Sequence, residues 1–86
     1  EKKYGAINEK EKALYAFQTA MDYAKEIGDD QTCAMIHYEE GRIYDEFNDL
    51  NEALDNYDKA IKQTTDNNLK ARASLYMGKI YDDYVE

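Results

Sequence analysis

Apolar residues recur at intervals of three and four along most of the chain, which is the spacing of one face of an α-helix. The pattern breaks at 8–9, 28–30, 48–50 and 66–68, where polar residues predominate. Between the interruptions the pattern predicts about five helices, namely the tail of a truncated first helix at 1–7 and longer helices at 12–27, 31–47, 51–65 and 69–84. Gly28 is expected to end one helix in the left-handed conformation, and Asp29 and Asp30 are placed to cap the next. We therefore expect an all-α chain of antiparallel helical hairpins.

The pattern also repeats within the chain. Six residues have counterparts of like type 40 residues further on, where Ala13, Leu14, Phe17, Ala20, Met21 and Ala24 correspond to Ala53, Leu54, Tyr57, Ala60, Ile61 and Thr64. Gly41 and Tyr44 recur 37 residues later as Gly78 and Tyr81. Tyr4 precedes Ala13 by nine residues as Tyr44 precedes Ala53, which is why we place a turn at Asn8-Glu9 in analogy with Asn48-Asp49. Such repeats are typical of stacked helical hairpins.

One stretch has the residue spacing of a known repeat family. Gly41, Tyr44, Ala53, Tyr57 and Ala60 follow the order of small and aromatic residues in a tetratricopeptide repeat (TPR). The chain resembles this family along nearly its whole length, and it is similar to members with repeats of 37–40 residues rather than the usual 34. The resemblance implies an α-solenoid with a single TPR-like domain at 1–86. Its parts would be a partial repeat at 1–27, a full repeat at 30–65, and a half repeat or capping helix at 68–85.

The resemblance also implies a binding groove. In TPR proteins the first helices of successive hairpins line a concave surface, to which each of the two corresponding helices here would contribute one stripe. The stripes are Met35, Tyr38, Arg42 and Asp45 on the helix expected at 31–47, and Arg72, Leu75, Lys79 and Asp82 on the helix expected at 69–84. Arg42 and Lys79 would then face a carboxylate or acidic ligand, with Tyr38 and Leu75 giving apolar contact. The alternative is an ordinary solvated face.

Charge and composition narrow the classes of partner. The net charge is −8, from 19 acidic and 11 basic residues, which argues against a nucleic acid because phosphates require a basic surface. With 43% hydrophobic residues in helical order, the chain is too apolar to be disordered. No apolar run approaches transmembrane length, so we expect no membrane partner. Cys33 is the single cysteine, and on these grounds we expect a cytoplasmic protein. Because the first residue is Glu1, we expect a fragment or a processed chain.

The residues offer little for catalysis. There is no glycine-rich phosphate loop, and one histidine and one cysteine leave few ways to build acid–base or nucleophilic chemistry. His37 is expected to be a packing residue with a hydrogen-bonded ring. Asp29, Asp30, Cys33 and His37 match no recognised zinc spacing. We therefore expect no enzymatic activity, no cofactor and no metal.

The sequence accordingly predicts a protein–protein interaction module, or scaffold, that binds a peptide or helix of a partner protein in the concave groove. The alternative is a structural spacer or self-association element of a larger TPR superhelix without a ligand of its own. In that case homo-oligomers would form through the exposed end helices.

Overall fold

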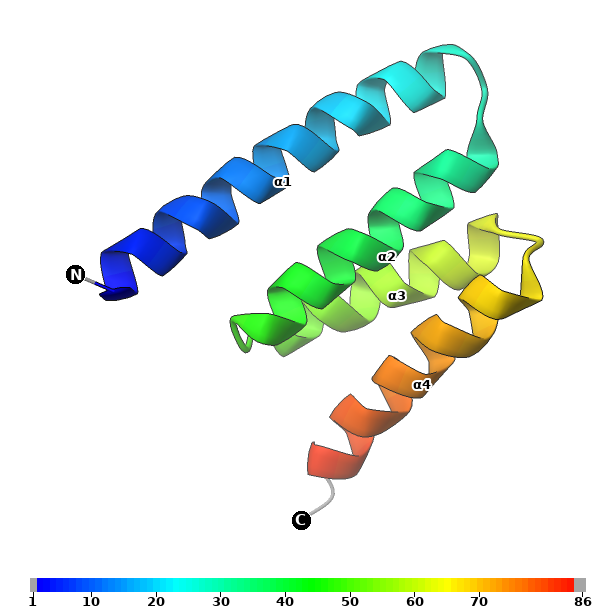
Figure 1. Cartoon of the computed structure of the whole chain (residues 1–86). Coiled ribbons are helices and arrows are strands. Elements are labelled where there is room, and N and C mark those ends of the chain that lie inside the picture. Colours follow the sequence, from blue (N-terminus) through cyan, green and yellow to red (C-terminus); the bar gives the residue numbers. More distant parts are fainter. Residues whose placement is uncertain (1, 85–86) are drawn as a thin grey trace.

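The computed structural model describes residues 2–84 of the chain and the side chains of residues 8–83. The described residues form four helices and no strand: α1 (Lys2–Glu26), α2 (Asp30–Glu46), α3 (Leu50–Gln63) and α4 (Asn67–Tyr84). Consecutive helices run in alternating directions, and each packs against the next (Figure 1). The predicted all-α class is confirmed.

The predicted turn at Asn8-Glu9 is wrong, and with it the expectation of five helices. α1 continues through both residues as a single helix of 25 residues. A turn does form at the corresponding Asn48-Asp49, and the difference lies in the residues that follow the asparagine at each place. Asp49 is a favourable residue for the start of a helix, whereas the run from Glu9 to Lys12 consists of glutamates and lysines, which are good helix formers and poor caps. The helical pattern therefore passes through this position without a break.

The first two observed turns lie where the sequence predicts them. Gly28 lies in the left-handed region at φ 70°, and the Asp29 carboxylate accepts a hydrogen bond from the Thr32 N–H at 3.1 Å. Asn48 also adopts a positive φ, 66°, which asparagine tolerates better than most residues. These residues end α1 and α2 and allow each following helix to run back along its predecessor.

The third turn lies about two residues earlier than predicted. α3 ends at Gln63, and Thr64 is extended at ψ 150°. The Thr64 hydroxyl accepts from the Asp66 N–H at 3.0 Å, and the Asp66 carboxylate accepts from the Asn68 N–H at 3.0 Å. The turn therefore uses side-chain hydrogen bonds to the backbone where the other two use a residue with positive φ.

Two apolar clusters join the helices. The larger lies among α2, α3 and α4 and contains Ala34, Tyr38, Ala53, Tyr57, Ala60, Leu69, Ala73 and Ile80. The smaller joins α1 to α2 through Met21, Ala24, Cys33 and Ile36, with Phe17 packed at its edge. In the larger cluster α2 and α3 approach each other closely at Gly41, where a Cβ would meet Cε1 of Tyr57 at 2.7 Å. The small residue allows α3 to seat its largest buried ring directly on the backbone of α2.

α1 and α4 are the outer helices of the fold. Figure 1 shows α1 and α4 on opposite sides of the α2–α3 pair. As far as the described residues go, α1 packs on α2 alone, while α4 packs on α3 and touches α2. None of the four helices, over the residues described, has an apolar stretch of the length that a membrane crossing requires.

Candidate functional site

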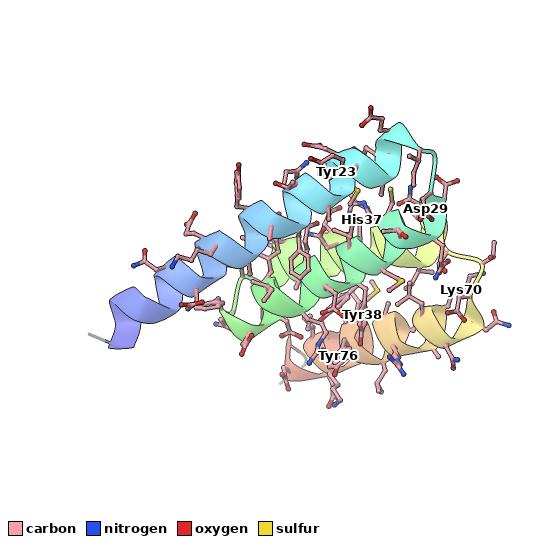
Figure 2. All side chains as sticks on the ribbon, turned by 45° about the horizontal axis from the view of Figure 1, so that its top comes forward. Tyr23, Asp29, His37, Tyr38, Lys70 and Tyr76 are labelled. Carbon is pink, nitrogen blue, oxygen red and sulfur yellow. The ribbon has the colours of Figure 1, made fainter. Side chains whose placement is uncertain are left out.

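Three tyrosines from three helices meet where α2 and α4 approach each other. The ring of Tyr57 lies 6.0 Å from that of Tyr38 and 5.8 Å from that of Tyr76, measured between centroids, and Tyr38 and Tyr76 are 6.1 Å apart. Tyr57 and Tyr76 are stacked at an interplanar angle of 13°. Figure 2 shows Tyr38 on α2 and Tyr76 on α4. Because each ring belongs to a different helix, the cluster fixes α2 and α4 relative to α3.

Two cations from different helices lie at the outer ring of this cluster. The guanidinium carbon of Arg42 is 5.6 Å from the centroid of Tyr76, and Nζ of Lys79 is 5.5 Å from it. Both distances are within the range of cation–π attraction. The ion pairs found among the described side chains involve neither of these residues. The fold therefore brings together two exposed charges that are free to bind a carboxylate.

An open hollow of about 420 Å³ lies beside these cations. Its lining combines Arg42, Ile43, Tyr57 and Tyr76 with the carboxylates of Glu39, Asp45 and Glu46. The Tyr57 hydroxyl donates to Oδ2 of Asp45 at 3.4 Å. Burial, and then the Asp45 carboxylate, raise the pKa of Tyr57, so that its hydroxyl stays protonated and serves as a fixed donor. The lining thus places one cation and two aromatic rings beside three carboxylates.

A second hollow continues the same two helical stripes toward the other ends of the helices. It measures about 200 Å³ and is lined by Gln31, Met35, Asp66, Asn68, Leu69 and Arg72. Met35 is 52% exposed, which is unusual for a large apolar side chain on an α2 whose other faces are covered. Met35 and Arg72 therefore offer an apolar contact and a further cation on this side of the molecule.

The residues predicted for the groove occupy different places in the structure. Five line the hollows or flank Tyr76: Met35, Arg42, Asp45, Arg72 and Lys79. Leu75 and Asp82 are exposed on α4 and line neither hollow. Tyr38 is only 6% exposed, so it supports the surface from within the aromatic cluster and has little area left for an apolar contact with a ligand.

Tyr76 is the residue that the sequence interpretation missed. Its ring is half-buried and packs against the larger apolar cluster. Its position four residues after Arg72 and three before Lys79 nevertheless places it on the same helical stripe as both cations. This spacing is the signal that could have found it.

His37 lies apart from the hollows, at the junction of α2 and α3. Its Nδ1 is 3.3 Å from Oδ1 of Asn56 and 3.7 Å from Oε1 of Glu40. Burial lowers the pKa of His37 and raises the pKa of Glu40, both of which disfavour the charged forms. The histidine is therefore neutral at pH 7 and donates to Asn56, as expected for a packing residue.

Comparison with known proteins adds nothing to this geometry. The chain matches no family model, and neither a curated protein nor a solved structure matches it. The TPR resemblance thus remains a prediction that rests on the spacing of residues such as Gly41 and Tyr57.

Proposed function

We propose that the chain is a TPR-like protein-interaction module that binds a peptide or helix of a partner protein across α2 and α4. The observation that carries the proposal is the meeting of Arg42 and Lys79, from two helices, on the ring of Tyr76. Holding two free cations against an aromatic face in a chain of net charge −8 is not needed for solubility. It does suit the recognition of a carboxylate.

The hollows suggest what the bound segment looks like. Its acidic group would lie between Arg42 and Lys79, and its next residues would pass the carboxylates of Glu39, Asp45 and Glu46. A segment with one acidic residue and a basic or polar neighbour fits this order of charges better than a continuous acidic run. An apolar side chain further along would reach Met35 in the second hollow.

The test is a binding screen against a library of short peptides, in which the chain is compared with an Arg42→Glu/Lys79→Glu double variant. We expect the selected peptides to share an acidic position and to lose most of their affinity for the double variant. The matched control is Lys12→Glu/Lys59→Glu, which changes the net charge equally at two exposed lysines away from the hollows. Circular dichroism establishes that all three proteins are equally helical.

The outcomes separate binding at this site from general charge effects. Equal loss of binding in both double variants would mean that only the overall charge matters. Unchanged binding in the Arg42→Glu/Lys79→Glu protein would show that the groove is not the binding surface. In either case the proposed site would be wrong.

A second candidate is the structural one, a spacer or self-association element without a ligand of its own. The observation that favours it is the exposure of large apolar side chains at the outer helices, with Tyr23 on α1, Ile27 directly after α1, and Tyr81 on α4. In this case binding energy would come from the outward faces of the end helices and not from the groove.

A further inference from the structure

α4 carries an uncovered copy of the surface on which α2 receives α3. Gly41 on α2 is filled by the ring of Tyr57, whereas a Cβ at Gly78, its counterpart on α4, would meet nothing within 4 Å. Tyr81 is 52% exposed, while its counterpart Tyr44 is partly buried. Ala71 is exposed as well, in contrast to the fully buried Ala34. The surface has the shape to receive a helix, and no described helix lies on it.

α1 carries the complementary surface, also uncovered. Ala60 on α3 is fully buried, and its counterpart Ala20 on α1 is exposed. Tyr57 is 0% exposed because α2 covers one side of it and α4 the other, whereas its counterpart Phe17 is only partly buried because α1 packs on α2 alone. α1 also bears the exposed Tyr23 (labelled in Figure 2), and the exposed Ile27 follows directly after the helix.

The contacts between α2 and α3 show how the two surfaces would fit. Placing Phe17 where Tyr57 lies would seat its ring on Gly78, in the way that Tyr57 is seated on Gly41. The polar contact of His37 with Asn56 becomes a contact of Ser74 with Ala16, two small residues that leave no large polar group buried without a partner.

Tyr57 makes two further contacts with α2, and both can be transferred to Phe17. The neighbour of Tyr57 on α2 is Tyr38, and the corresponding residue on α4 is the exposed Leu75. The hydroxyl of Tyr57 reaches Asp45, but Phe17 has no hydroxyl, and the corresponding Asp82 is exposed to water. The contact of Phe17 with Leu75 would be apolar, and Asp82 would stay in water, so neither contact buries an unpaired polar group.

The charges at the ends of the two helices also match. In an antiparallel arrangement like that of α2 and α3, the last turn of α4, with Asp82 and Asp83, meets the region of Lys12 on α1. Complementary charges of this kind favour one direction and register of docking.

We propose that α1 of one copy docks on α4 of a second copy and repeats between chains the contact that α2 and α3 make within one. The contact joins different surfaces on the two partners, so it continues from copy to copy into short open oligomers. The inference develops the second candidate function and does not require a ligand in the groove. A chain can associate in this way whether or not Arg42 and Lys79 bind a peptide.

Sedimentation velocity over a wide range of concentrations tests the association, and Gly78→Ala is the decisive variant. The added methyl group has room in the single chain, yet it would occupy the space that the ring of Phe17 requires. We expect the average mass of the unsubstituted chain to rise with concentration, and the dissociation constant to increase by about ten- to a hundredfold in Gly78→Ala, as overpacking predicts. Tyr15→Ser, which removes an exposed ring on the opposite side of α1, should leave association unchanged. A chain that stays monomeric throughout, or a Gly78→Ala variant that associates normally, would overturn the proposal.

Cross-linking tests the pairing of unlike surfaces. Chains with Ala16→Cys are mixed with differently tagged chains carrying Ser74→Cys, and a short bis-maleimide is added; the native Cys33 is buried. Cross-links are expected between the two kinds of chain and not within either kind. Efficient linking of Ala16→Cys chains to one another would instead show a symmetric dimer and contradict head-to-tail docking. Charge reversal at Arg42 and Lys79 should leave the cross-links intact, which separates this proposal from that of the groove.

Discussion

Replacing Gly41 by alanine tests whether the close approach of α2 and α3 holds the fold together. The new Cβ would lie 2.7 Å from Cε1 and 2.8 Å from Cδ1 of Tyr57, closer than real Cβ atoms come. The ring is 0% exposed and packs against both Tyr38 and Tyr76, so it cannot shift away from α2 without disturbing these contacts. Overpacking of this kind costs about 1–3 kcal/mol of unfolding free energy. The gain in helix propensity from glycine to alanine offsets about 1 kcal/mol of that cost.

Gly78→Ala is the matched control, since it makes the same change in helix propensity without a contact within 4 Å. It should stabilise the chain by about 1 kcal/mol. The difference between the two variants therefore isolates the overpacking and should be about 1–3 kcal/mol. Urea unfolding followed by circular dichroism, at concentrations too low for association, measures both values. Equal stability of the two variants would show that the Tyr57 ring is not fixed against α2, and the reasoning about this interface would fail.

Three further changes test the turns and the buried tyrosine. Burial and Asp45 raise the pKa of Tyr57 in the folded chain. Above about pH 10 the unfolded chain therefore loses the tyrosine proton while the folded chain keeps it, and the free energy of unfolding falls. Tyr57→Phe should reduce this alkaline loss of stability. Urea titrations at neutral and alkaline pH measure the effect, and an equally steep loss in the variant would contradict it. Asp29→Ala should lower the urea midpoint by removing the acceptor of the Thr32 N–H, while Asp29→Asn should keep most of the cap; similar midpoints for the two variants would argue against capping. Gly28→Ala should destabilise the chain by about 1 kcal/mol, because φ is 70° there, and an unchanged melting temperature would speak against that strain.

The sequence predicted the parts of the fold that depend on local chemistry. Gly41 and Tyr57 could be recognised as repeat positions because a residue without a Cβ and a large ring recur at fixed spacing. The turn at Gly28-Asp29 could be found because a left-handed residue and a cap are signalled by residue type alone. In both cases the identity of one or two residues determines the conformation.

The error at Asn8-Glu9 shows where repeat analogy fails. The counterpart of Lys10 is Leu50, which packs partly against the larger apolar cluster. Lys10 instead extends from the continuous helix to Asp49, with 2.7 Å between Nζ and Oδ2, and its Nζ lies 5.4 Å from the ring centroid of Phe47. A lysine at this position cannot supply the apolar contact that Leu50 makes after its turn. The repeat spacing alone therefore did not determine whether the chain turns at Asn8-Glu9.

The candidate site was harder to predict because it depends on distances between helices. The helical stripes identify which residues share a face, but not which of them a neighbouring helix covers. Tyr38 and Arg42 lie on one stripe of α2, yet the aromatic cluster covers the first and leaves the second exposed. Tyr76 lies beside two cations because α2 contributes Arg42 and α4 contributes Lys79, and the sequence does not show that these helices are neighbours.

The sequential packing of the helices has a consequence for local unfolding. Since α1 contacts α2 and no other described helix, it can detach while the larger cluster among α2, α3 and α4 stays closed. Such partial opening costs less free energy than global unfolding. Amide protons in α1 should therefore exchange with solvent deuterium well before those around Tyr57 in α3, and the two regions should behave as separate cooperative units.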